Sequence, residues 1–190
     1  MNELLTKTAA ALKERDYEVA LAATPEEAAA RVLAEAKNAA TVGWGGSETI
    51  KALGLRDALA ALGKDIRDHQ TVMDLFLLSA NALTTDGRIV NIDGNGNRVA
   101  ASIYGPKRVI YVIGSNKIVD GGIDAAIARI HREACPPNAK RLGKKTPCAL
   151  TGVCNDCSSP ERMCKVTAIF DRRPTGTPTL VILVDAPLGY

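Results

Sequence analysis

Four of the five cysteines in this 190-residue chain fall between positions 148 and 164. The stretch around them, residues 136–160, is rich in proline, glycine and polar residues and has almost no periodic apolar pattern. Such a stretch cannot bury enough surface to stay ordered by itself, so something must hold it. The start of the chain has no signal-peptide pattern, so we expect a cytoplasmic protein with reduced thiols. Metal ligation is therefore favoured over disulfide formation.

The cysteines have the spacing C-x5-C-x2-C-x6-C, which offers Cys148, Cys154, Cys157 and Cys164 as four soft ligands. Soft thiolates select iron–sulfur clusters or zinc over hard cations. Structural zinc usually uses two C-x2-C pairs, and only Cys154 and Cys157 form such a pair here. The spacing favours a [4Fe–4S] cluster, with zinc and with free or redox-active thiols as the alternatives. Cys135 lies outside the run and is expected to pack, although it could replace a ligand.

The purpose of such a metal site stays open at the level of sequence. A cluster could serve redox or Lewis-acid chemistry, or it could simply fold a loop that has little core of its own. Basic side chains that could offset the negative charge of four thiolates lie beside or within the run: Lys144, Lys145, Arg162 and Lys165.

Composition excludes several classes of protein. With 46% apolar residues the chain can build one substantial core, so we expect a single domain over residues 1–190. A net charge of +3 and 4% aromatic residues provide neither the basic stripe nor the stacking platform of a nucleic-acid binder. The longest apolar runs, residues 109–113 and 180–184, are far shorter than the roughly 20 residues that span a bilayer. We expect a soluble protein without membrane insertion.

Apolar periodicity and turn residues predict helices and strands that alternate along the chain. Segment 71–83 is apolar enough to be helix, strand or both, and segment 180–184 is apolar throughout, as in a strand covered on both faces. The alternation favours a layered α/β fold. Helices are expected over residues 2–15, 24–37, 48–53, 55–62 and 123–134, and strands over 17–22, 40–42, 88–92, 108–113, 166–171 and 179–185.

A glycine turn, residues 43–47, follows a predicted strand and opens a predicted helix. Its backbone amides and the helix dipole could hold a phosphate or a carboxylate. Glu48 stands where a dinucleotide fingerprint needs its third glycine, and no P-loop signature follows. A plain tight turn explains the pattern equally well.

Two polar segments surround a predicted strand. Residues 93–98 superficially resemble a calcium loop, but Arg98 at the sixth position and Tyr104 at the twelfth exclude calcium. That segment is predicted as a turn, with Asn97 and Arg98 available to a ligand. Residues 79–87 carry small polar side chains of the kind that line a crevice in α/β proteins, although turn chemistry alone could explain Asp86 and the following glycine.

His69 and His131 are the two histidines of the chain, and neither has a triad partner evident in the sequence. We expect both on the surface or at the edge of the core. No Ser-His-Asp hydrolase is indicated.

Several of these motifs together resemble the LUD domain (lactate utilization) family in order and spacing over nearly the whole chain. The cysteine elements within residues 146–164 resemble the stand-alone, cysteine-bearing branch of that family. The matching segments are residues 42–47, 79–82, 93–98, 105–106, 114–119 and 137–142.

The resemblance implies a three-layer α/β/α fold with a mostly parallel sheet, similar to the sugar-phosphate isomerase and CoA-transferase superfamily, plus a metal-binding cysteine loop at residues 135–165. In that fold the glycine turn and segment 81–86 face a common crevice. Family members are tied to the oxidation of lactate to pyruvate, usually beside separate iron–sulfur subunits, so other lactate-oxidation subunits are the macromolecular partners implied. The sequence leaves the oligomeric state open.

Three functions follow from the residues and the resemblance. The first is an iron–sulfur accessory or electron-transfer component of lactate (2-hydroxyacid) oxidation. The second is an isomerase-like or transferase-like enzyme that binds a small anionic metabolite such as a sugar phosphate or a CoA ester, with Glu48 and Asp86 as acid/base candidates. The third is a metal-stapled regulatory subunit. The expected ligand-binding residues are Gly45, Gly46, Ser47, Asn81, Thr84, Asn97, Arg98 and Lys117.

Overall fold

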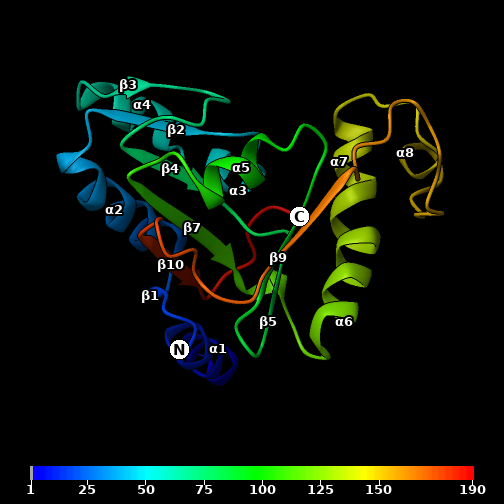
Figure 1. The fold of residues 1–190 in the computed structure, drawn as a ribbon, viewed down its shortest axis with the longest axis horizontal. Coiled ribbons are helices and arrows are strands. Elements are labelled where there is room, and N and C mark those ends of the chain that lie inside the picture. Colours follow the sequence, from blue (N-terminus) through cyan, green and yellow to red (C-terminus); the bar gives the residue numbers. More distant parts are fainter. Residues whose placement is uncertain (1) are drawn as a thin grey trace.

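The computed structural model describes residues 2–190 and shows two β-sheets with helices packed against them (Figure 1). The larger sheet has the order β1-β10-β7-β4-β2-β3, and all of its neighbouring strands are parallel. Alternating helices and strands therefore do build a parallel sheet, as the sequence predicted. Its strands are β1 (Glu18–Ala22), β2 (Thr41–Trp44), β3 (Asp65–Ile66), β4 (Leu75–Leu78), β7 (Arg108–Gly114) and β10 (Thr179–Val184).

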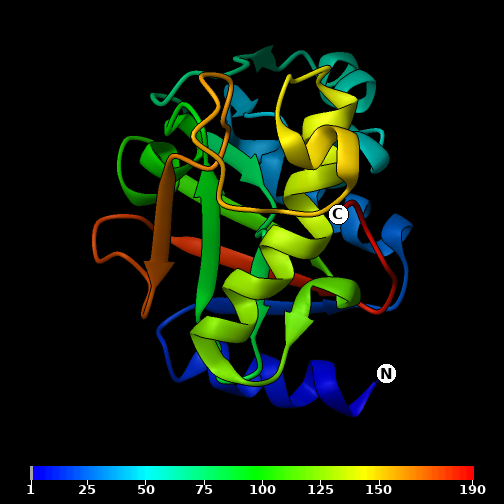
Figure 2. The same cartoon turned by 90° about the vertical axis from the view of Figure 1, so that its right-hand side faces the viewer.

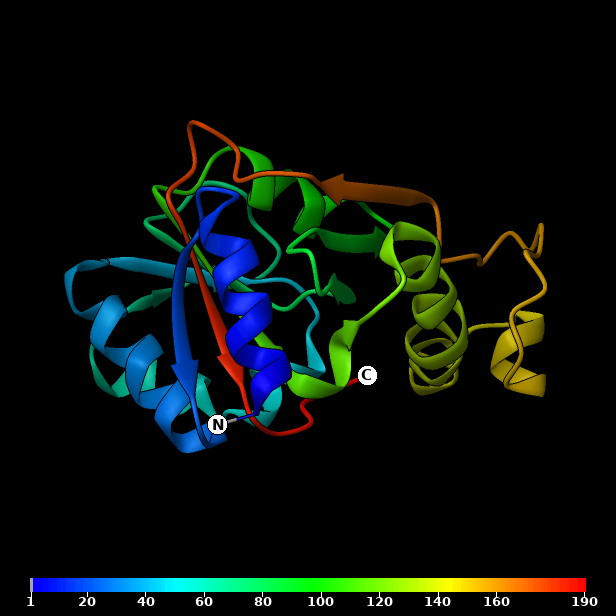
Figure 3. The same cartoon turned by 90° about the horizontal axis from the view of Figure 1, so that it is seen from below.

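Helices cover one face of this sheet, and a helix together with the second sheet covers the other. On the first face lie α2 (Pro25–Glu35), α3 (Glu48–Ala52) and α4 (Leu55–Ala61), which pack against the apolar side chains of β4, β7 and β10. On the second face lies α1 (Glu3–Lys13), which runs across β1 and β10 (Figure 3). Every residue of β10 is buried, as expected for a strand covered on both sides. The predicted three-layer α/β/α arrangement is confirmed.

The second sheet is smaller and mixed. Its order is β8-β5-β6-β9, where β6 (Ile89–Asp93) is antiparallel to both β5 (Ala82–Thr84) and β9 (Val166–Phe170), and β8 (Ile118–Val119) is parallel to β5. Helix α6 (Gly122–Arg129) packs over this sheet, in front of its strands in Figure 2. The apolar segment 71–83 thus contains strand β4 and the first two residues of β5, and these strands belong to different sheets.

The helix that starts at α6 continues much further than its apolar period predicts. A π-helical turn (Ile130–Ala134) joins α6 to α7 (Cys135–Arg141), and α8 (Pro147–Thr151) lies beside α7 (Figure 1). Segment 136–160, in which we found almost no apolar period, therefore holds regular structure. The proline of α8 stands in its first turn, where the missing N–H has no helical partner to bond, whereas the two prolines of α7 directly follow the π-helical turn.

None of the helices described between residues 2 and 190 is long and apolar enough to cross a membrane.

Asp74 ties the edges of β2 and β4 together and makes stability depend on pH. Its carboxylate accepts hydrogen bonds from the backbone N–H groups of Ala40 and Thr41, both at 2.9 Å, and pairs with Lys107 at 2.8 Å. The hydrogen bond to Lys107, followed by those to the backbone, holds the pKa of Asp74 well below its usual range. A depressed folded-state pKa stabilises the protein above the unfolded-state pKa, and this contribution is lost as the pH falls toward the folded-state value.

We therefore expect Asp74→Asn to lower the urea midpoint at neutral pH, and the gap to wild type to shrink as the pH falls from about 6 to about 3. Urea titrations at both pH values measure this gap. The matched control is Asp57→Asn, because Asp57 is exposed and should give a small gap at both pH values. A gap for Asp74→Asn that stays constant with pH would contradict the assignment.

Candidate functional site

A cavity of about 400 Å³ lies where the chain leaves the carboxyl ends of several strands. Ligand sites in parallel sheets commonly form at this edge, because the loops that follow the strands meet there. Residues after β2 (Gly46 to Thr49), after β4 (Ser79 to Asn81) and after β7 (Lys117) line the cavity from the side of the parallel sheet. Residues of α7 and of the segment that precedes β9 close it from the opposite side.

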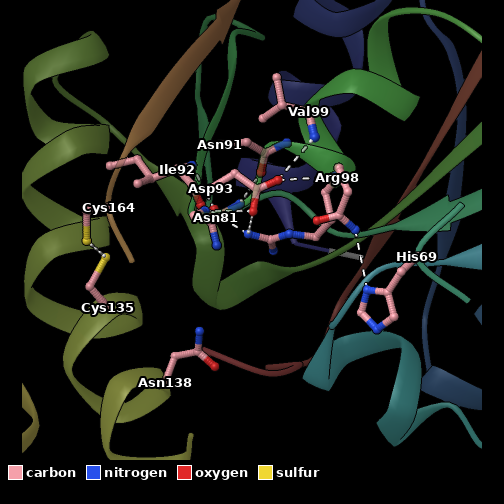
Figure 4. A network of polar contacts seen from close by, with 12 residues as sticks. His69, Asn81, Asn91, Ile92, Asp93, Arg98, Val99, Cys135, Asn138 and Cys164 are labelled. Carbon is pink, nitrogen blue, oxygen red and sulfur yellow. Dashed lines mark hydrogen bonds and ion pairs between the residues drawn. The ribbon is translucent and has the colours of Figure 1, made fainter. Parts of the chain in front are cut away.

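Asp93 and Arg98 form a rigid polar network on one wall (Figure 4). The Asp93 carboxylate accepts hydrogen bonds from the backbone N–H of Arg98 at 3.1 Å and of Val99 at 3.3 Å, and pairs with the Arg98 guanidinium at 3.3 Å. Asp93 thereby caps α5 (Asn97–Ile103), a helix that begins where the sequence predicted only a turn. The Arg98 guanidinium also donates to the carbonyl of Ile92 at 3.0 Å, which fixes its direction.

Gly45 packs closely against the side chain of Arg98. A Cβ atom at Gly45 would lie 2.4 Å from the Cγ atom of Arg98, so a side chain there would push Arg98 away. Gly45 was predicted to bind a ligand through its backbone. In the structure it does not line the cavity, and it acts by leaving room for the arginine.

His69 lines the cavity, although no sequence motif predicts a histidine there. Its backbone is left-handed, with φ of 59°. Its Nδ1 atom is 3.4 Å from the side-chain amide nitrogen (Nδ2) of Asn97 (Figure 4). Its own backbone N–H donates to the carbonyl of Trp44 at 3.0 Å. A left-handed non-glycine residue is strained, and strain of this kind often marks functional sites.

Lys117 is the most enclosed charged group of the cavity, with 4% of its surface exposed. Its Nζ atom donates to the hydroxyl oxygens of Thr49 at 2.8 Å and Ser79 at 2.9 Å. No carboxylate in residues 2–190 pairs with it at ion-pair distance. Burial, and then the charges of Arg129 and Arg98, lower the pKa of Lys117 to about 7.

The remaining charges make the cavity electropositive. The Arg141 guanidinium pairs with Glu48 at 3.3 Å, so the carboxylate predicted as an acid/base group is held beside a permanent cation. Lys144 forms no ion pair with the residues that the structure describes. Four basic side chains of Lys and Arg line the cavity against two carboxylate side chains, which leaves an excess of two positive charges when Lys117 is protonated and of one when it is neutral. A small anion suits such a site.

A second, smaller cavity of about 20 Å³ adjoins the first and is lined by all five cysteines. The sulfurs of Cys135 and Cys164 are 3.2 Å apart, and the hydroxyl of Thr146 is 3.3 Å from the sulfur of Cys148. The hydrogen bond with Cys135, together with the nearby Arg162 guanidinium, lowers the pKa of Cys164 below the usual range of a thiol. Thiolates are the metal-binding form of cysteine, so this lowering prepares Cys164 to act as a ligand.

Arg162 holds the cysteine loop in its curved path. Its guanidinium donates to the backbone carbonyls of Cys157 and Cys164, each at 2.8 Å, and pairs with Asp156 at 2.6 Å. Few apolar contacts help it, because α8 has no buried residue. The loop is therefore held mainly by polar contacts.

In the described part of the chain, no three His, Cys, Asp or Glu side chains form a group that could hold a metal ion, and all five cysteines are free thiols. The cysteines surround a cavity from several sides. A multi-iron cluster takes its thiolates from around a volume, and the soft donor set matches such a group. The four-cysteine metal site stays a prediction, which the soft donor set around the cavity supports.

The two cavities share a wall. Cys135, Met163 and Cys164 line both of them. Figure 4 shows Cys135 and Cys164 on the α7 side, across from His69 and Arg98. A ligand in the larger cavity would therefore lie next to the sulfurs of the smaller one.

The structure gathers most of the predicted ligand-binding residues in the larger cavity and leaves some outside. Inside are Gly46, Ser47, Glu48, Asn81, Asn97, Arg98 and Lys117.

Thr84 and Asp86 do not line the larger cavity. The Asp86 carboxylate pairs with Arg15 at 3.2 Å and with Arg88 at 3.3 Å, and it accepts a hydrogen bond from the Thr84 hydroxyl. The chain passes the cavity at residues 79–81 and then runs along β5, which carries Thr84 and Asp86 away from it. The structure therefore gives Asp86 a role in a surface ion-pair cluster beside α1 in place of the predicted acid/base role.

Sequence reasoning missed several residues of the site. Asp93 and Arg141 lie within motifs of the family resemblance. These motifs mark both residues, but the sequence alone assigns neither of them a place in the cavity. His69 has no such signal, because its position depends on the loop that follows β3. The sequence predicts Lys144 only as a basic neighbour of the cysteines, whereas it also lines the larger cavity.

Comparisons with known proteins agree with this fold. The sequence model described as the LUD domain matches residues 5–184. Among solved structures, the crystal structure of a DUF162 family protein from Deinococcus radiodurans is similar, with a TM-score of 0.59, 16% sequence identity, and coverage of 96% of this chain and 97% of that chain. At this identity the likeness shows a shared fold. The search of curated proteins gives no match.

Proposed function

Because the chain belongs to the LUD domain family, which is associated with lactate utilization, we propose that it is an iron–sulfur component of 2-hydroxyacid oxidation. It binds a small carboxylate in the larger cavity and a cluster in the smaller one. The observation that carries this proposal is the wall of Cys135, Met163 and Cys164 that the two cavities share.

Cys148, Cys154, Cys157 and Cys164 would hold the cluster, and Cys135 packs against Cys164 from α7. When bound, a [4Fe–4S] cluster supplies one-electron transfer. Arg162 contributes positive charge close to the thiolates, and its hydrogen bonds to two cysteine carbonyls keep the loop closed around the cavity. Other subunits of a lactate-oxidation system are the partners that such a component would exchange electrons with.

The larger cavity supplies recognition of the carboxylate. Lys117 and Lys144 have no carboxylate partner among the described residues, so an anionic ligand would neutralise them. The side-chain amide of Asn81 accepts a hydrogen bond from the backbone N–H of Ile92 at 2.9 Å, which leaves its NH₂ group available. A 2-hydroxy or 2-oxo acid offers the matching carboxylate and an oxygen on the adjacent carbon.

Anaerobic purification followed by iron, zinc and sulfide analysis tests the cluster, and thermal-shift titration tests the ligand. We expect brown protein with iron and sulfide in equal amounts and a rise in melting temperature with lactate and pyruvate. A colourless protein with stoichiometric zinc would refute the redox proposal. Absence of any shift with 2-hydroxy and 2-oxo acids would refute the ligand.

A second candidate function rests on Glu48. Its carboxylate lines the larger cavity beside Arg141, so an acid/base group faces the ligand site. This supports an isomerase-like or transferase-like enzyme that acts on a sugar phosphate or a CoA ester. Larger thermal shifts with these phosphorylated compounds than with lactate or pyruvate would favour it.

A further inference from the structure

The surroundings of Lys117 suit a reactive amine as well as a cation that binds an anion. Its Nζ atom is enclosed, and the charged side chains near it are mainly cations: Arg98 and Arg129, with Arg141 and Lys144 farther along the cavity lining. The two carboxylates of that lining are already paired, Asp93 with Arg98 and Glu48 with Arg141. Burial in such surroundings disfavours the charged form of an amine and so increases its neutral, nucleophilic fraction.

The hydrogen bonds around Nζ direct its lone pair. The Thr49 hydroxyl donates to the carbonyl of Leu188 at 3.1 Å, and the Ser79 hydroxyl donates to the carbonyl of Ala80 at 3.4 Å. Both hydroxyl oxygens therefore accept from Lys117, at 2.8 and 2.9 Å. A neutral amine has two N–H donors and one lone pair. With both donors engaged, the lone pair is left for an electrophile, which is the arrangement of an activated lysine nucleophile.

We propose that Lys117 captures the carbonyl carbon of a 2-oxo acid as an imine, an inference that rests on the proposed function. The Nζ lone pair forms a bond to the carbon next to the carboxylate. The carbon–oxygen double bond then breaks in two stages, and the oxygen leaves as water with the two hydrogens of the amine. No group is oxidised or reduced in this step, so it needs no cofactor.

The cavity suits a short 2-oxo acid. Its volume of about 400 Å³ lies at the small end of the range for ligand pockets, roughly 300 to 1,000 Å³, and favours a chain of few carbons. The neighbouring cations can hold the carboxylate and orient the carbonyl toward Nζ. The chemistry also fits a 2-hydroxyacid system, because oxidation of a 2-hydroxy acid yields the 2-oxo acid that the amine would capture.

Reductive trapping tests the imine directly. The full-length wild-type protein is incubated with pyruvate and cyanoborohydride, digested, and mapped by mass spectrometry. We expect a pyruvate-derived adduct on Lys117 that forms at least about tenfold faster than on the exposed Lys7, because burial leaves far more of the Lys117 amine neutral. Lactate, which has no carbonyl, should compete with labelling without forming an adduct.

Two variants separate capture from simple charge pairing. Lys117→Arg keeps a cation for the carboxylate but cannot form an imine, so it should retain a thermal shift with pyruvate and lose the adduct. Lys7→Met changes an exposed lysine of α1 and should leave labelling of Lys117 unchanged. Circular dichroism checks that both variants are folded.

The outcomes distinguish this inference from the function on which it rests. Wild-type protein that binds pyruvate but labels Lys117 no faster than Lys7 would overturn the imine and leave the proposed ligand intact. Failure to bind any 2-oxo or 2-hydroxy acid would overturn both. A selective adduct in protein that contains no iron would support the imine while removing the cluster proposal.

Discussion

Replacing Cys154 with serine is expected to remove iron and sulfide from the anaerobically purified protein and to open the connection between α7 and β9 to proteases. The reason lies in how little else orders this connection. Leu150 is 87% exposed, Val153 is 67% exposed, and α8 has no buried residue. The proposed metal would order a segment that has so little core, so we expect loss of the metal to become loss of local folding.

The measurement combines iron and sulfide analysis with limited proteolysis and mapping of the cuts. We expect new cuts between residues 144 and 165, while the parallel sheet keeps its resistance because β4, β7 and β10 are buried. Serine variants of Cys148, Cys157 and Cys164 should behave in the same way.

Cys135→Ser is the matched control, because Cys135 lines the same cavity but comes from α7 and stands outside the run. It should retain the iron. The proposal fails if Cys154→Ser keeps its colour and iron, and the ligand set is wrong if Cys135→Ser loses them.

The sequence was most informative where local and global signals agree. Helix α2 begins where Thr24 and the following proline predicted it, and the Thr24 hydroxyl accepts a hydrogen bond from the backbone N–H of Glu27 at 3.2 Å. Strand β10 was recognised because a strand buried on both faces has an unbroken apolar run. Both signals lie within a few neighbouring residues, so a single sequence is enough to read them.

Helices and strands that depend on residues far away in the chain could not be predicted from such local signals. Helix α7 has two prolines and a short apolar face, and it exists because it continues α6 across the π-helical turn over the second sheet. Segment 71–83 divides between β4 and β5 because these two strands pair with different sheets. The apolar periodicity of the sequence does not show where one strand ends and the next begins.

The site shows the same limit. Asn81 and Asp86 are close in sequence, and both were predicted to face one crevice. Asn81 lines the cavity, whereas β5 carries Asp86 to an ion-pair cluster with Arg15 and Arg88. Burial lowers the pKa of Lys117, and the charges of Arg129 and Arg98 add to this effect from two other elements, so only the folded structure reveals that this lysine is unusual.

Arg129→Met is expected to cost about 3 to 5 kcal/mol of stability and to weaken pyruvate binding, because one buried side chain holds two walls of the cavity together. Arg129 is 2% exposed. Its guanidinium donates to the carbonyl of Asn116 at 3.1 Å and to the carbonyl of Asn81 at 2.7 Å. Methionine fills similar space but leaves both buried carbonyls without a donor, and each unsatisfied group costs about 1 to 3 kcal/mol.

The effect should reach the ligand because Asn81 itself lines the cavity and Asn116 directly precedes Lys117. Urea unfolding measures the loss of stability, and thermal-shift titration with pyruvate measures the loss of affinity. Arg132→Met is the matched control on the same long helix, since the Arg132 side chain is 69% exposed and pairs with Glu133 at the surface. Its cost should stay within about 1 kcal/mol, with pyruvate binding unchanged. Equal losses for the two variants would show that Arg129 does not hold the cavity walls in place.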